Sequence, residues 1–220
     1  MKQELKKDPL LEKISEFDSF VRENKNKLIY SIGAIVVIVV ISILLINSKR
    51  TANRKASGDL GIAQIAISQG DIDNAILQLE DLTRKYAGTR SAGMGIILLA
   101  NTYLTQLDYE NAGKYFQAYL DEYKDDKLIV SSAYNGLGIC AEQNEDFQAA
   151  AEYFGKSSEN SAYKFQEHEA KINSARNYIK VGDIKKAGQM INNILDEEMS
   201  KENQDKAEIL DAQIRVLNVE

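Results

Sequence analysis

Residues 144–154 read NEDFQAAAEYF, and they contain the pattern that decides the fold. Asp146 is followed by Phe147, then by Ala150, and then by Phe154. The same order of Asp, apolar residue, Ala and large apolar residue occurs in three more places: Asp71, Ile72, Ala75 and Leu79; Asp108, Tyr109, Ala112 and Phe116; and Asp183, Ile184, Ala187 and Ile191. Successive copies begin 37, 38 and 37 residues apart. A repeat of this length is typical of stacked helical hairpins, each of which needs its neighbours to bury its apolar face.

Each copy predicts two helices joined by a turn that contains the Asp. In the third copy, Leu137 and Gly138 lie on one face of the first helix, and Ala150 and Phe154 pack back against it from the second. These four residues fall where tetratricopeptide repeats have Leu, Gly, Ala and an aromatic residue. The sequence therefore predicts an all-α fold, in which residues 58–203 form a tetratricopeptide-repeat (TPR) α-solenoid of about four helical hairpins.

The two ends of this array differ from its middle. The first and fourth copies match the repeat pattern less well, as terminal repeats often do because one side of them meets solvent. After Ser200, four apolar residues recur at helical spacing: Ala207, Leu210, Ile214 and Leu217. They predict a capping helix over residues 204–220.

A run of 19 residues without a charge, Leu28 to Ile46, precedes the repeats. At about 1.5 Å per residue such a helix is about 28 Å long, which matches the apolar thickness of a bilayer. A buried core helix is the soluble alternative, but the run has no polar face. A cleaved signal peptide would need a small-x-small cleavage site, which residues 47–51 do not offer. We expect an uncleaved single transmembrane helix over 28–46, continued by a juxtamembrane helix over 47–57.

Residues 1–27 form a short segment before this helix. Leu10, Ile14, Phe17 and Val21 recur there at helical spacing and predict an amphipathic helix. This helix either docks on a membrane surface or a partner, or lies beside its own anchor. Basic residues flank the apolar run equally: Lys13, Arg22, Lys25 and Lys27 before it, and Lys49, Arg50, Arg54 and Lys55 after it. The positive-inside rule therefore does not assign an orientation.

Charge is divided unevenly along the 220 residues. Residues 1–55 hold 11 Lys and Arg against 6 Asp and Glu, whereas residues 56–220 hold 16 against 27. The repeat region is therefore acidic and repels phosphate backbones, which makes nucleic acid an unsuitable partner. Proteins or peptides are the expected partners.

The residues that most catalytic sites need are scarce. Cys140 is the only cysteine and His168 the only histidine, so the clustered ligands of a zinc site are missing. Cys140 stands at a small-residue position of a first helix, where a structural thiol is expected. His168 lies near the start of the fourth copy's first helix, where we expect an exposed, structural side chain. The sequence predicts no catalytic residues, no metal and no cofactor, and hence no enzyme.

What remains is a binding surface, because the first helices of such arrays line the concave face. The inward positions in the four copies are Leu60, Gln64 and Ile67; Met94, Ile97, Asn101 and Leu104; Asn135, Ile139 and Glu142; and Ile172, Arg176 and Ile179. Apolar side chains with interspersed amides suit an extended peptide, whose backbone bonds the amides. The alternative is that a terminal helix of the same chain covers these residues.

The stretch Phe20-Val21-Arg22-Glu23-Asn24-Lys25-Asn26-Lys27, leading directly into the apolar run, resembles the YfgM-like family of ancillary Sec-translocon subunits. The order of the parts also matches that family. The resemblance implies a cytoplasmic N-terminus, an inner-membrane anchor, and a periplasmic TPR domain. The implied partners are translocon subunits, periplasmic chaperones and secreted clients. Two other functions stay open: assembly of another envelope complex, and regulation of an enzyme or a cytoplasmic pathway by an inward-facing domain.

Overall fold

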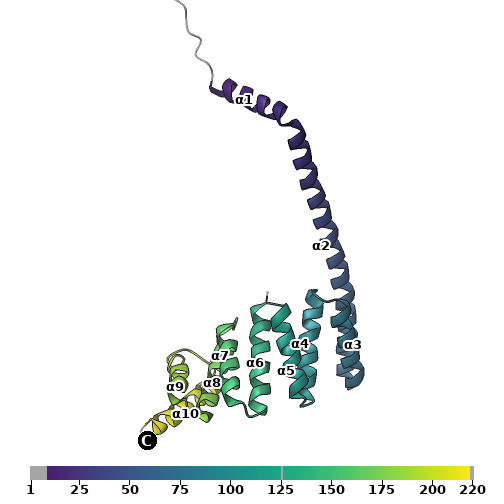
Figure 1. Cartoon of the computed structure of the whole chain (residues 1–220). Coiled ribbons are helices and arrows are strands. Elements are labelled where there is room, and N and C mark those ends of the chain that lie inside the picture. Colours follow the sequence, from purple (N-terminus) through teal and green to yellow (C-terminus); the bar gives the residue numbers. More distant parts are fainter. Residues whose placement is uncertain (1–8, 125, 219–220) are drawn as a thin grey trace, which may run out of the picture. The chain divides into compact units, whose positions relative to one another are not determined.

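The computed structural model describes residues 9–124 and 126–218, which form ten α-helices and no strand (Figure 1). The chain divides into two compact units, Met1–Thr51 and Ala52–Glu220, which are considered separately. The first eight residues of the expected N-terminal segment 1–27 and the last two of the expected capping helix 204–220 lie outside the described residues. The all-α prediction is confirmed.

The N-terminal unit contains α1 (Pro9–Glu23) and the first part of α2 (Lys25–Ser68). Within the described part of the chain, α2 alone is long and apolar enough to cross a membrane; its most apolar 18-residue window has a mean hydropathy of 3.0. None of that window is buried. Among the described residues nothing covers this window, whereas the core helix of a soluble protein is mostly buried.

The second unit is a row of helical hairpins in sequence order (Figure 1). The C-terminal part of α2 packs against α3 (Ile72–Lys85) in shared apolar clusters. Three complete hairpins follow: α4 (Arg90–Thr105) with α5 (Tyr109–Glu122), α6 (Lys127–Gln143) with α7 (Phe147–Glu159), and α8 (Lys164–Lys180) with α9 (Ile184–Asn192). The chain ends in α10 (Lys201–Leu217), which packs against α8 and α9. Its buried residues Ala207, Leu210 and Ile214 cover the open side of the fourth hairpin, as expected of a capping helix.

The recurring Asp begins the second helix of every hairpin. Asp108, Asp146 and Asp183 each accept a hydrogen bond from the backbone N–H three residues later, at 3.0, 3.0 and 3.1 Å. Such side chains satisfy backbone donors that the first turn of a helix leaves free. Asp71 occupies the same place in the first hairpin but makes no such bond to the backbone.

The residue before each of these Asp residues has a left-handed backbone. Gly70, Leu107, Glu145 and Gly182 have φ angles of 79°, 61°, 61° and 80°. In each turn the N–H of the following Asp donates to a carbonyl five residues earlier, as Asp108 does to Tyr103 at 3.0 Å. This is the bond pattern that commonly ends a helix. The repeated motif therefore marks four turns of one geometry.

Small residues allow the helices to approach each other closely. The four recurring Ala residues are 0% exposed, and the large apolar residues after them are at most 1% exposed. A Cβ atom added to Gly138 would lie 2.8 Å from the ring of Phe154, and one added to Gly136 would overlap the ring of Phe116. The expected contact of Gly138 with its hairpin partner is thus present. Cys140 is buried in the same core, and this burial raises the pKa of its thiol to about 11, which keeps it protonated and inert.

Candidate partner-binding surface

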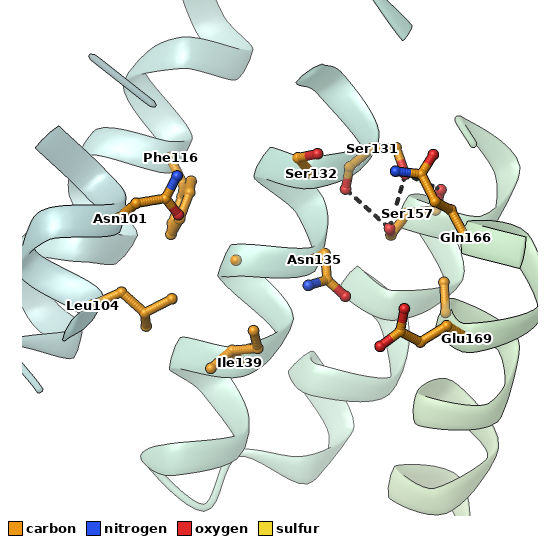
Figure 2. A pocket seen from close by; sticks show the side chains of 12 residues that line it. Asn101, Leu104, Phe116, Ser131, Ser132, Asn135, Ile139, Ser157, Gln166 and Glu169 are labelled. Atoms are coloured by element: carbon orange, nitrogen blue, oxygen red, sulfur yellow. Dashed lines mark hydrogen bonds between the residues drawn. The ribbon is translucent and has the colours of Figure 1, made fainter. Parts of the chain in front are cut away.

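A pocket of about 280 Å³ opens between the first helices of the second, third and fourth hairpins (Figure 2). Helix α4 contributes Asn101 and Leu104, α6 contributes Asn135 and Ile139, and α8 contributes Gln166 and Glu169. The remaining lining residues are Phe116, Ser131, Ser132, Gly136, Ser157 and Ala170. The pocket therefore combines residues that are far apart in the sequence and come mainly from the first helices of three consecutive repeats.

Four of the expected groove residues meet here: Asn101, Leu104, Asn135 and Ile139. Gln166 and Glu169 were missed by the sequence analysis. Glu169 lies one turn before Ile172 on the same face of α8, and Gln166 lies two turns before it. The helical spacing could therefore have identified both residues. The missed Ser131, Ser157 and Phe116 sit beside neighbouring helices, and only the packing of the hairpins brings them to the pocket.

The groove residues of the first hairpin lie elsewhere. Leu60 and Ile67 are partly buried against α3 and α4, and Gln64 is exposed. In the second hairpin, Met94 lines a separate pocket of about 200 Å³, whose other lining residues are Arg90, Gly93, Tyr119, Tyr123, Asp126 and Ile129. Ile97 is partly buried against the core of the second and third hairpins. These residues are not part of the pocket between α4, α6 and α8.

In the fourth hairpin, Ile172 is 3% exposed and packs in the core beside α9 and α10, so it presents no surface to a partner. Ile179 is partly buried against the same core. Arg176 donates to Glu142 at 2.8 Å, and Lys180 donates to the other oxygen of Glu142 at 2.8 Å. Glu142 therefore joins α6 to α8 and holds two cations.

The ionisation of Glu142 reflects that contact. Partial burial opposes its charge, but the hydrogen bonds and charges of Lys180 and Arg176 outweigh it and hold the pKa of this carboxyl below its usual range. Glu142 and Arg176 thus have partners within the chain, and they join two hairpins.

The pocket's polar side chains differ in whether they have partners. The hydroxyls of Ser131 and Ser157 each donate to the other residue's backbone carbonyl at 2.9 Å, tying α6 to α7. In contrast, within the described part of the chain Asn101, Asn135 and Glu169 make no hydrogen bond or ion pair through their side chains, and the buried Oε1 of Gln166 receives no donor. In Figure 2 the side chains of Asn135 and Glu169 point toward one another from α6 and α8.

His168 is buried rather than exposed, so that prediction was wrong. Its side chain is 1% exposed, and its Nε2 lies 3.1 Å from Oε2 of Glu197. Glu197 follows α9, in a segment that folds back over the start of α8; this contact joins residues 29 apart and leaves no periodic signal. The pKa of Glu197 is lowered to about 2, first by Lys164, whose Nζ lies 2.9 Å from the same oxygen, and then by His168. Among the described residues no three His, Cys, Asp or Glu side chains gather as metal ligands.

Comparison with known proteins agrees with this geometry. The family model for the tetratricopeptide repeat matches residues 60–127 and 97–161. No curated protein matches the sequence.

Several solved structures share the fold. A tetratricopeptide repeat protein from Parabacteroides merdae is 13% identical, with a TM-score of 0.61 over 74% of this chain and 60% of that one. MamA is 15% identical, with a TM-score of 0.53 over 74% of this chain and 87% of that one. YrrB, a TPR protein with an unusual peptide-binding site, is 15% identical, with a TM-score of 0.52 over 74% of this chain and 86% of that one. Residues 60–161 therefore carry tetratricopeptide repeats, and the unit that contains them has the TPR-solenoid fold.

Proposed function

We propose that this protein is a non-enzymatic, membrane-anchored scaffold that binds protein segments on the surface formed by α4, α6 and α8. The observation that carries the proposal is the pocket between these helices. There Asn101, Asn135 and Gln166 offer side-chain amides that bond no other described residue, and they lie beside Leu104 and Ile139. Amides bond a peptide backbone, and apolar side chains cover its residues.

Two further findings support binding of proteins or peptides. TPR solenoids present extended surfaces that many proteins use for recognition, and the similar YrrB has a peptide-binding site. Catalysis has no corresponding support, because Cys140 is buried with a raised pKa and His168 is buried against Glu197. The described residues also hold no cluster of metal ligands.

The membrane anchor is proposed for residues 28–46. Its support is the length, hydropathy and lack of buried residues of this part of α2, since apolar side chains that the described residues do not cover require another apolar environment. The resemblance of residues 20–27 to the YfgM-like family supports a cytoplasmic N-terminus, a bacterial inner-membrane location and a periplasmic repeat unit. It also supports a role beside the Sec translocon, with hand-off of secreted proteins to periplasmic chaperones.

Cross-linking in intact cells tests this function. The full chain is cross-linked, solubilised in detergent and purified, and the attached proteins are identified by mass spectrometry. Translocon subunits, periplasmic chaperones or secretory precursors are expected. Recovery of components of another envelope machine would instead support an assembly role at that machine.

Protease treatment of spheroplasts tests the orientation independently. A periplasmic repeat unit is cut from outside, whereas an inward-facing unit is protected until the membrane is opened. Protection, together with capture of cytosolic proteins alone, would contradict the translocon role and favour regulation of a cytoplasmic pathway.

A further inference from the structure

We infer that the pocket between α4, α6 and α8 accepts an arginine or lysine side chain from an extended segment of the partner protein. The inference deepens the proposed function and rests on it. It concerns which type of partner residue the pocket selects, and Glu169 is the side chain that pairs with the charge of that residue.

The size of the pocket favours a side chain over a whole small molecule. Its volume of about 280 Å³ lies just below the roughly 300–1,000 Å³ of pockets that enclose drug-sized ligands. One long side chain fills such a space while its backbone runs along the helices outside. The amides of Asn101 and Asn135 come from neighbouring hairpins and can bond that chain; in Figure 2 Asn135 on α6 stands between Asn101 on α4 and Glu169 on α8.

The polar lining favours a cation. Its hydrogen-bonding side chains are amides, hydroxyls and one carboxylate, with no Lys, Arg or His among them. The buried Oε1 of Gln166 accepts from no donor, and an acceptor left in this state is costly. Arg and Lys carry three to five donors and no acceptor, so they match this lining, whereas an acidic side chain would meet Glu169.

The charges on the neighbouring helices single out Glu169. The first helices of the second, third and fourth hairpins carry three acidic residues, Glu142, Glu167 and Glu169. Glu142 is held by Arg176 and Lys180, and Glu167 lies 2.6 Å from Lys171. Glu169 has no cation within the described residues. It is the acid on this surface that remains available to a partner.

The apolar lining suits the rest of the same side chain. Leu104 and Ile139 stand on α4 and α6, opposite Glu169 (Figure 2). Arg and Lys place three or four methylene groups before their charge, and these cover apolar surface while the head group reaches a polar site. A short cation or a free metal ion would leave Leu104 and Ile139 uncovered.

The test uses the full chain in detergent micelles and three pools of fluorescent nonapeptides. Their flanking positions are randomised, and their central residue is arginine, citrulline or glutamate. Citrulline has almost the shape of arginine but no charge. The arginine pool is expected to bind at least about two- to fivefold more tightly than either other pool, because Glu169 is exposed and an exposed ion pair contributes modestly to affinity. Glu169→Gln should remove that preference, and Glu169→Arg should transfer it to the glutamate pool.

Glu198→Gln is the matched control, because it removes the same charge from an exposed residue outside the pocket. It should leave binding unchanged. Equal binding of the arginine and citrulline pools, equal effects of the two Gln variants, or no binding of any pool would each overturn the inference. The scaffold function fails separately, when cross-linking in cells captures no envelope or secretory protein.

Discussion

The central and terminal hairpins use glycine for different purposes. In the second and third hairpins, Gly95, Gly136 and Gly138 lie within the first helices, where a Cβ would collide with a neighbouring side chain. In the first hairpin, Gly58 and Gly61 have nothing within 4 Å of such a Cβ. The turns show the reverse: the terminal hairpins have Gly70 and Gly182 at the left-handed position, whereas the central ones have Leu107 and Glu145.

This difference shows which constraint each hairpin satisfies. The central first helices are covered on both sides by neighbouring hairpins, so small residues are needed where the helices meet. A terminal hairpin has another hairpin on one side only, and its glycines Gly70 and Gly182 provide turn geometry instead. The most glycine-dependent packing also borders the pocket, since Gly136 and Phe116 both line it.

The largest effect is expected at the alanines that all four hairpins share. Ala150→Glu places an unpaired charge at a position that is 0% exposed, which costs about 3–5 kcal/mol and unfolds the hairpin. Thermal unfolding of the full chain in detergent, followed by circular dichroism, measures the loss. Ala212→Glu is the control, because Ala212 is exposed on α10. Equal melting of Ala150→Glu and the unchanged chain would contradict the packing.

The next effect separates central from terminal glycines. Gly136→Ala forces the added methyl into the buried ring of Phe116 and is expected to cost about 1–3 kcal/mol. Gly58→Ala adds the same methyl to an uncrowded helix and should instead gain about 0.5–1 kcal/mol. Denaturant unfolding of both variants gives the sign of each change in the free energy of unfolding. Changes of the same sign would remove the distinction drawn between the hairpins.

A smaller effect is expected in the turns. Gly182→Ala introduces a Cβ at a φ of 80° and should destabilise the chain by about 1 kcal/mol. Glu145→Gly relieves the same steric cost in a central turn, but glycine loses more conformational entropy on folding. The net gain in the free energy of unfolding is about 0.5 kcal/mol. The same unfolding measurement checks both, and a loss of stability in Glu145→Gly would show that its side chain has another role.

The smallest effect concerns pH at the junction of the third and fourth hairpins. The pKa of Glu142 is lowered in the folded chain, so its contribution is complete above the unfolded value of 4.5 and is lost as pH falls through the folded value. The melting temperature should therefore fall as the pH is lowered below about 4.5, and it should fall less in Glu142→Gln than in the unchanged chain. Identical pH profiles of the two proteins would show that the ion pairs with Arg176 and Lys180 do not stabilise the junction.

Local patterns were sufficient to predict the repeats, because their turn geometry depends on adjacent residues. Asp146 caps α7 by accepting from the backbone N–H three residues later, and Ala150 packs one turn after it, so both leave a periodic trace in the sequence. The pocket was predicted in part for the same reason: Asn101, Leu104, Asn135 and Ile139 follow helical spacing. Periodicity identifies which face of a helix looks inward.

Contacts that join distant segments left no such trace. His168 is buried because Glu197 folds back over it, and Ile172 is buried because α9 and α10 pack there. Likewise, the pairing of Glu142 with Arg176 and Lys180 depends on the spacing between two hairpins. Only these tertiary contacts distinguish the available acid, Glu169, from the engaged ones.

Site-specific photo-crosslinking in cells most directly tests whether the surface of α4, α6 and α8 binds a partner. A photoreactive amino acid is placed at Ile139, which lines the pocket, and in a control at Ile209, which is 66% exposed on α10. Adducts with translocon subunits, chaperones or secretory precursors are expected from position 139, and far fewer from position 209. Equal adducts from both positions, or adducts from position 209 alone, would contradict binding at this surface.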